Sequence, residues 1–217
     1  MMDSHLLIHQ DSLDTEYWTP RPIVEASQYV LRQIDLDPAS CAAANERVRA
    51  TSYFEAPHFE VIDEWGGVPV RRFDEAQAFC NPWRGRVFMN HPFSTGDAKC
   101  RPGCTKKRCI KRGWHTLTTL PSNADWIRYY VKQFQTGQMV EAINICFAAT
   151  GATWFKPLLL YPQCFVSPRV NYDRPDGKSA TGATKESVVT YLGHDLKRFA
   201  AAFEPFGEIK VHYLWTN

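Results

Sequence analysis

The stretch GRVFMNHPFS, Gly85 to Ser94, decides the fold that the sequence predicts. It starts as an apolar strand and changes abruptly to an amide, a histidine, a proline and an aromatic residue. A second apolar stretch, MVEAINICFA at 139–148, is nearly continuous, which is typical of a strand covered on both faces of a sheet. Ligands of such sheets bind at the carboxyl ends of the strands, so the polar end of the first stretch is a candidate site.

Strands and helices alternate along the chain. The patterns predict strands at 34–38, 85–90, 139–148, 163–166, 187–193 and 209–215, and helices at 19–33, 121–137 and 195–207. The Pro- and Gly-bearing residues 55–82 are expected to be irregular. This alternation predicts an α/β fold with a mostly parallel sheet and helices on both faces.

The size of the chain predicts one domain. Its 217 residues, 44% of them hydrophobic, suit a single domain over 1–217, in which 1–15 form a flexible lead-in. No apolar run approaches 18 residues, and the polar first residues lack the basic end and apolar core of a secretory signal. We therefore expect a cytoplasmic protein without a membrane span. Its 7 cysteines are then not expected to form a disulfide framework.

A basic, cysteine-rich insert is expected at 95–118. The whole chain has a net charge of only +2, yet 99–112 holds seven Lys or Arg residues and no acid. Such a concentrated patch indicates contact with a polyanion such as nucleic acid, with a solvated loop as the alternative. The candidate DNA-contacting residues of the insert are Lys106, Lys107, Arg108, Lys111 and Arg112.

The same insert has the residue types of a metal site. Cys100, Cys104, Cys109 and His115 follow the spacing C-x3-C-x4-C-x5-H. Three thiols and an imidazole suit a tetrahedral structural zinc, and free thiols in a basic loop are the alternative. A short loop with so many like charges would not fold unaided, and metal binding would supply the ordering free energy.

Asn90, His91, Pro92 and Phe93 resemble the Asn/Asp/Ser-Pro-Pro-aromatic loop of amino-group methyltransferases, with histidine in place of the first proline. In that chemistry a side-chain oxygen and the next backbone carbonyl accept the two N–H bonds of a base amine, and the aromatic ring stacks on the flipped base. His91 has the required carbonyl, and Pro92 holds the residue before it extended. A role for His91 as a general base is less favoured, and a strand ending in a plain turn is the structural alternative.

Three motifs in order extend the resemblance. YWTPRPIVEA at 17–26, IDLDPASCAAAN at 34–45 and W-x-G-R-V-F-M-N-x-P-F-S at 83–94 resemble the phage-encoded Dam-like DNA N6-adenine methyltransferases. AINICFAATGATWF, PRVNY and ESVVTYLG continue the likeness, which covers Tyr17 to Gly193.

The resemblance implies a Rossmann-like methyltransferase fold, S-adenosylmethionine as methyl donor and adenine in double-stranded DNA as acceptor, in a phage or prophage protein. It implies catalytic roles for Asn90, His91, Pro92 and Phe93. The implied donor-binding residues are Tyr17, Trp18, Thr19, Pro20, Asp37, Pro38, Ala39 and Ser40.

Some assignments stay open on the sequence. The chain departs from the family's loop at His91, and the turn after Asp37 lacks the G-x-G of many methyltransferases. The acid that holds the donor's ribose could be Glu46, Asp63 or Glu64. Arg169 could face the DNA groove or form an ion pair. Cytosine-N4 methylation and a catalytically silent, zinc-stabilised DNA-binding module are the alternative functions.

Overall fold

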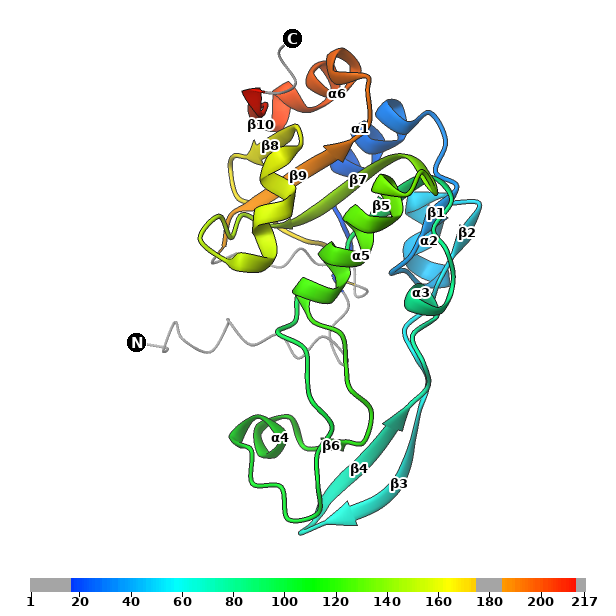
Figure 1. Ribbon diagram of the computed structural model, residues 1–217, viewed down its shortest axis with the longest axis vertical. Coiled ribbons are helices and arrows are strands. Elements are labelled where there is room, and N and C mark those ends of the chain that lie inside the picture. Colours follow the sequence, from blue (N-terminus) through cyan, green and yellow to red (C-terminus); the bar gives the residue numbers. More distant parts are fainter. Residues whose placement is uncertain (1–16, 175–184, 214–217) are drawn as a thin grey trace.

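The computed structural model describes residues 17–174 and 185–213, so the expected lead-in at 1–15 lies outside the described residues. Its largest feature is a seven-stranded sheet with the order β10-β8-β9-β7-β5-β1-β2 (Figure 1). The strands are β1 (Leu36–Asp37), β2 (Ser52–Tyr53), β5 (Gly85–Met89), β7 (Met139–Phe147), β8 (Gln163–Val166), β9 (Ser187–Leu192) and β10 (Gly207–Lys210).

The sheet is mixed. Strands β2, β1, β5 and β7 are parallel to one another. Strand β9 runs antiparallel to both β7 and β8, and β10 runs antiparallel to β8. Most strands therefore point the same way, as predicted, but antiparallel pairing governs the β7–β10 half, which the alternation of elements did not indicate.

Helices cover both faces of this sheet, as predicted. Helices α1 (Arg21–Leu31) and α6 (Leu196–Phe203) pack on one face, and α5 (Asn123–Gln135) and the 3-10 helix η2 (Thr153–Leu160) on the other (Figure 1). Side chains of β5 alternate between the faces: Phe88 joins the α1 cluster, whereas Val87 and Met89 join the α5 cluster. Among the described residues, no helix is long and apolar enough to cross a membrane.

The order of the strands reverses at β1. From β1 the chain passes through α2 (Ala42–Val48) to β2 on one side, whereas β5 and then β7 lie on the other side. In open α/β sheets such a reversal opens a crevice beyond the carboxyl ends of the two strands that flank it. Asp37 ends β1, and Asn90 directly follows β5, so both lie at the carboxyl ends of the two strands where the order reverses.

The expectation of an irregular segment at 55–82 was wrong. This segment contains strands β3 (Phe59–Trp65) and β4 (Val68–Phe73), which pair as an antiparallel hairpin, and the short helix α3 (Gln77–Cys80). Gly66 and Gly67 form the turn with φ of +60° and +80°, a conformation that glycine adopts without strain. The Gly-Gly pair between two apolar-aromatic runs was the signal for this hairpin.

The hairpin and the cysteine-rich insert form one unit, which we call the arm (59–73 and 95–118). Strand β6 (His115–Thr116) of the insert pairs with β4 in a small three-stranded sheet, and α4 (Lys107–Arg112) lies beside it. The ring of Phe73 packs on Trp114 at 5.3 Å between centroids. Figure 1 shows the arm extending from one end of the main sheet.

Candidate functional site

The turn after β1 buries a carboxyl group. Asp37 is only 3% exposed, and its Oδ1 accepts a hydrogen bond of 3.1 Å from the backbone N–H of Ala39. Burial raises the pKa of Asp37 to about 7, although the bonds from Ala39 and the Ser40 hydroxyl act in the opposite direction. The backbone N–H of Ser40 bonds to the carbonyl of Phe54, which fixes the Asp37–Ser40 turn against the end of β2.

The segment before α1 lies against the turn after strand β8. Trp18 and Asp173 form an antiparallel bridge, with N–O distances of 2.7 and 3.0 Å. Arg47 of α2 donates to the carbonyl of Thr19 at 3.0 Å and pairs with the carboxylate of Asp173 at 2.5 Å. The hydroxyl of Thr19 is buried and has no hydrogen-bond partner among the described residues. Residues 17–20 are thereby fixed beside α2, which starts directly after the Asp37–Ser40 turn.

The loop after β5 meets this segment. Nδ2 of Asn90 donates to the carbonyl of Tyr17 at 3.4 Å, so the amide is oriented by the segment expected to bind the donor. None of the described residues donates a hydrogen bond to Oδ1 of Asn90, which is left as an acceptor. The ring of Phe93 packs against Phe147 with centroids 4.3 Å apart and against Tyr172 at 6.0 Å.

The side chain of His91 points into the protein. It is 1% exposed, with Nε2 at 3.2 Å from Oδ1 of Asn123 and Nδ1 at 3.4 Å from Nδ2 of Asn144. Burial lowers the pKa of His91 to about 4, so the ring is neutral at pH 7. The neutral tautomer protonated at Nε2 satisfies both contacts. The ring therefore anchors the loop to α5 and β7.

The cysteine cluster predicted from spacing is assembled in space. The ligand atoms of Cys100, Cys104, Cys109 and His115 all lie within 4.8 Å of one another. The Sγ atom of Cys109 is 3.6 Å from that of Cys100 and 3.9 Å from that of Cys104. Two sulfurs bound to one tetrahedral zinc lie about 3.8 Å apart, given Zn–S bonds of about 2.3 Å. The four residues thus form a group that could hold a metal ion.

One further feature of this group, an unpartnered ring nitrogen, favours a cation. Nδ1 of His115 is buried without a hydrogen-bond partner in the part of the chain that the structure describes. The backbone N–H of Lys106 lowers the pKa of the Cys104 thiol, whereas burial raises that of Cys109 to about 12. Because metal ligation requires thiolates, a cation would take the place of these protons.

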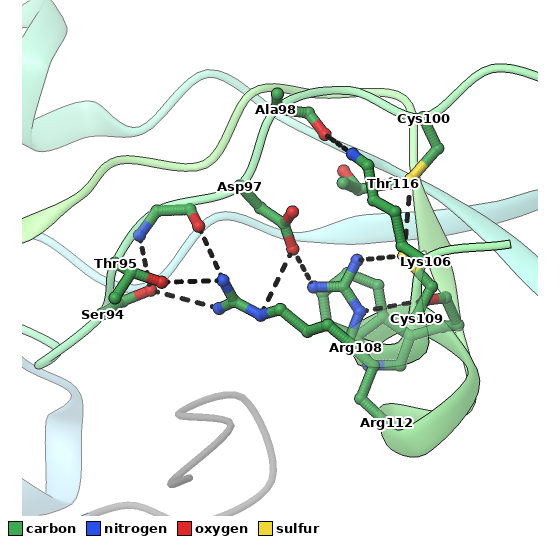
Figure 2. Close-up of polar contacts among 12 residues, drawn as sticks. Ser94, Thr95, Asp97, Ala98, Cys100, Lys106, Arg108, Cys109, Arg112 and Thr116 are labelled. Atoms are coloured by element: carbon green, nitrogen blue, oxygen red, sulfur yellow. Dashed lines mark hydrogen bonds and ion pairs between the residues drawn. The ribbon is translucent and has the colours of Figure 1, made fainter. Parts of the chain in front are cut away.

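The predicted DNA-contacting residues separate into two groups. Lys106, Lys107 and Lys111 are exposed, and Nζ of Lys106 lies 3.2 Å from the carbonyl of Ala98. Arg112 does not belong with them, because its side chain is 2% exposed and pairs with Asp97 inside the arm. Arg108 is bound to the loop after Phe93 (Figure 2).

Arg169 forms the ion pair that was one of its two expected roles. Its NH2 and Nε atoms lie 2.6 and 3.0 Å from Oε1 of Glu186. Both side chains are more than half exposed, so the pair contributes little to stability.

Glu55 is an acid at the strand ends that was not among the sequence candidates for the ribose contact. This residue follows β2 and is exposed at the carboxyl edge of the sheet, beside the end of β1. In dinucleotide-binding α/β folds the acid that binds a ribose comes about 20 residues after the first turn, and Glu55 follows Asp37 by a similar distance. Asp63 and Glu64 lie instead in β3 of the arm, on a different sheet.

Comparisons with protein-family models, with curated proteins and with solved structures found no match to this chain. The fold and site define its class only coarsely. It is an α/β protein with a reversal in the strand order of its main sheet and a Cys3His group, able to hold a metal ion, on an adjoining arm.

Proposed function

We propose that this protein is a DNA adenine-N6 methyltransferase that uses S-adenosylmethionine as methyl donor. One observation carries the proposal: three separate segments expected to act together meet at the carboxyl edge of the sheet. The Asp37–Ser40 turn and the Asn90–Phe93 loop follow adjacent strands. The Tyr17–Pro20 segment accepts the hydrogen bond from Asn90.

The Asn90–Phe93 loop supplies the groups that a base amine needs. Oδ1 of Asn90 and the backbone carbonyl of His91 would accept the two N–H bonds of the amine, which localises its lone pair for attack on the methyl group. Phe93 would stack on the flipped base and offset about 1–3 kcal/mol of the unstacking cost. Because positioning carries the reaction, no covalent intermediate with the protein is needed.

The buried ring of His91 supports this assignment of roles. Its two nitrogens are engaged with Asn123 and Asn144, and its low pKa leaves it neutral. A ring held in this way is not available to accept the amine proton, so His91 would act through its carbonyl. The histidine then replaces proline as the residue that fixes the loop, by hydrogen bonds instead of by a rigid ring.

The donor would lie along the turn after β1. Asp37 to Ser40 would border its amino-acid part together with Thr19, whose buried hydroxyl has no described partner. Glu55 at the end of β2 would accept hydrogen bonds from the ribose hydroxyls. S-adenosylmethionine supplies the methyl group when bound.

The arm would hold a structural zinc and contact the DNA backbone. Cys100, Cys104, Cys109 and His115 would be the zinc ligands, as the sulfur–sulfur distances and the orphaned His115 Nδ1 support. Lys106, Lys107 and Lys111 would then face phosphates, which gives affinity without sequence choice.

The test is methyl transfer from labelled S-adenosylmethionine to unmethylated DNA, followed by analysis of the nucleosides. Label in N6-methyladenine supports the proposal. Label in N4-methylcytosine would show that the same acceptor geometry serves cytosine. DNA binding without any label would refute an enzymatic function and favour a silent DNA-binding module.

A further inference from the structure

Arg108 and Arg112 connect the cysteine group to the loop that follows Phe93. Both lie on α4, one turn apart, and helical residues four apart share a face. Cys109, a member of the candidate metal group, lies between them on the same helix. The sequence predicted both arginines to contact DNA, whereas the structure turns both toward the protein (Figure 2).

Arg108 binds the loop through most of its guanidinium. NH1 donates to Oγ1 of Thr95 at 2.9 Å and to the carbonyl of Gly96 at 2.7 Å. NH2 lies 3.5 Å from Oγ of Ser94, and Nε lies 3.7 Å from Oδ2 of Asp97. One side chain therefore contacts each residue of the segment 94–97 (Figure 2).

Arg112 binds the same loop from the buried side. Its guanidinium pairs with the Asp97 carboxylate, which is 6% exposed on its side chain. The guanidinium also donates to the carbonyl of Trp114 at 2.9 Å and lies 3.7 Å from Sγ of Cys109. A zinc ion with three thiolates and a neutral imidazole has a net charge of −1. Arg108 and Arg112 together would balance this charge and that of the Asp97 carboxylate.

The loop is held at its other side by α5. Asn123 receives a hydrogen bond from the backbone N–H of Ser94 on the same Oδ1 that contacts His91. Segment 94–97 is thus held at two places. Arg108 of α4, next to Cys109, binds it on one side, and on the other side Asn123 binds both Ser94 and the His91 ring of the Asn90–Phe93 loop. Because Ser94 directly follows Phe93, displacement of segment 94–97 would also displace the Asn90–Phe93 loop.

We propose that Arg108 is a positioning residue, through which the metal-bound arm sets the geometry of the Asn90–Phe93 loop. The zinc group therefore has a role in transfer itself, besides presenting lysines to DNA. The catalytic part of this inference rests on the proposed methyl transfer. The structural coupling rests on the proposed zinc alone, because it concerns only the free protein.

The coupling is tested by hydrogen exchange of the full-length, zinc-loaded protein without DNA or donor. The amides of Gly96 and Asp97 donate to Oγ of Ser94 and to the carbonyl of Leu120, so their exchange reports the order of the loop. Arg108→Lys keeps the charge but loses the hydrogen bonds that the guanidinium donates to several residues of the loop. We therefore expect these amides to exchange at least tenfold faster at unchanged zinc content. Arg72→Lys is the matched control, since Arg72 is an exposed hairpin arginine paired with Glu60.

Removal of zinc with a chelator should accelerate the same amides and leave those of β7 unchanged. Unchanged exchange of Gly96 and Asp97 in Arg108→Lys, or after chelation, would overturn the coupling. In methyl transfer, Arg108→Lys should lower kcat at least tenfold with an unchanged KM for DNA. A raised KM with normal exchange would instead make Arg108 a phosphate contact and overturn the proposal. If the wild-type protein transfers no methyl group, the proposed function fails while the exchange result still decides the coupling.

Discussion

His91 and Asp37 should make the stability of this protein depend on pH in opposite directions. The folded protein holds the pKa of His91 at about 4, against 6.5 for an exposed histidine. Between these values the unfolded chain binds a proton that the folded protein does not, so the free energy of unfolding falls as the pH falls from 6.5 to 4. At about 1.4 kcal/mol per pKa unit, the full effect is about 3 kcal/mol.

Asp37 acts with the opposite sign. Its pKa is about 7 in the folded protein, against 3.8 in the unfolded chain. Between these values the folded protein binds the extra proton, so the free energy of unfolding falls as the pH rises from 3.8 to 7, by about 4 kcal/mol in all. Within pH 4 to 6.5 the two slopes therefore almost cancel in the wild-type protein.

Single substitutions should reveal how each group by itself makes the free energy of unfolding depend on pH. In His91→Gln, the free energy of unfolding relative to wild type should fall by about 2–3 kcal/mol between pH 4.5 and 6.5, because only the Asp37 effect remains. In Asp37→Asn it should rise by about the same amount over the same range. Each replacement is close in size to the original side chain, so the volume change is small.

The assay is urea denaturation followed by tryptophan fluorescence at pH 4.5, 5.5 and 6.5 with zinc present. At each pH the free energy of unfolding of the wild type is subtracted from that of the variant. The contributions of all other titrating groups, including the zinc ligands, then cancel. The slope of free energy against urea should stay the same in all three proteins. If both differences are independent of pH, then neither group is titrating as its burial requires, and the assignment of the neutral His91 ring would be refuted.

The remaining predictions concern the site and the arm. Asn90→Ala should lower methyl transfer at least a hundredfold with donor affinity unchanged by calorimetry; retained transfer would show that the loop is misassigned. Glu55→Gln should weaken donor binding about tenfold without affecting DNA affinity, and equal donor affinity would exclude the ribose contact. Metal analysis should find about one zinc per chain and less in Cys104→Ser, while under half an equivalent in the wild type would contradict a structural zinc. The double variant Lys107→Gln/Lys111→Gln should lower the slope of log DNA affinity against log salt by about 2, and an unchanged slope would exclude both phosphate contacts.

The sequence predicted the parts of the fold that local patterns control. Nearly continuous apolar runs such as 139–148 identified strands covered on both faces. The helix predicted at 121–137 was found as α5, where the Ser122 hydroxyl accepts a bond from the N–H of Asp125. Cysteine and histidine spacing indicated the metal group, because ligands close in sequence need little help from the rest of the fold to meet. The hairpin at 59–73 was missed although its Gly-Gly turn was readable.

Other features depended on contacts between residues far apart in the chain. The direction of β9, the burial of Arg112 and the inward turn of His91 each arise from partners on distant segments, such as Asn144 of β7. The basic residues of this short insert look alike in sequence, yet Arg112 is buried against Asp97 and the partly exposed Arg108 is turned toward the loop at 94–97. The sequence by itself thus determined which residue types gather at the strand ends and in the arm. Only the tertiary structure decided which of these side chains face outward, because burial and charge pairing depend on the whole fold.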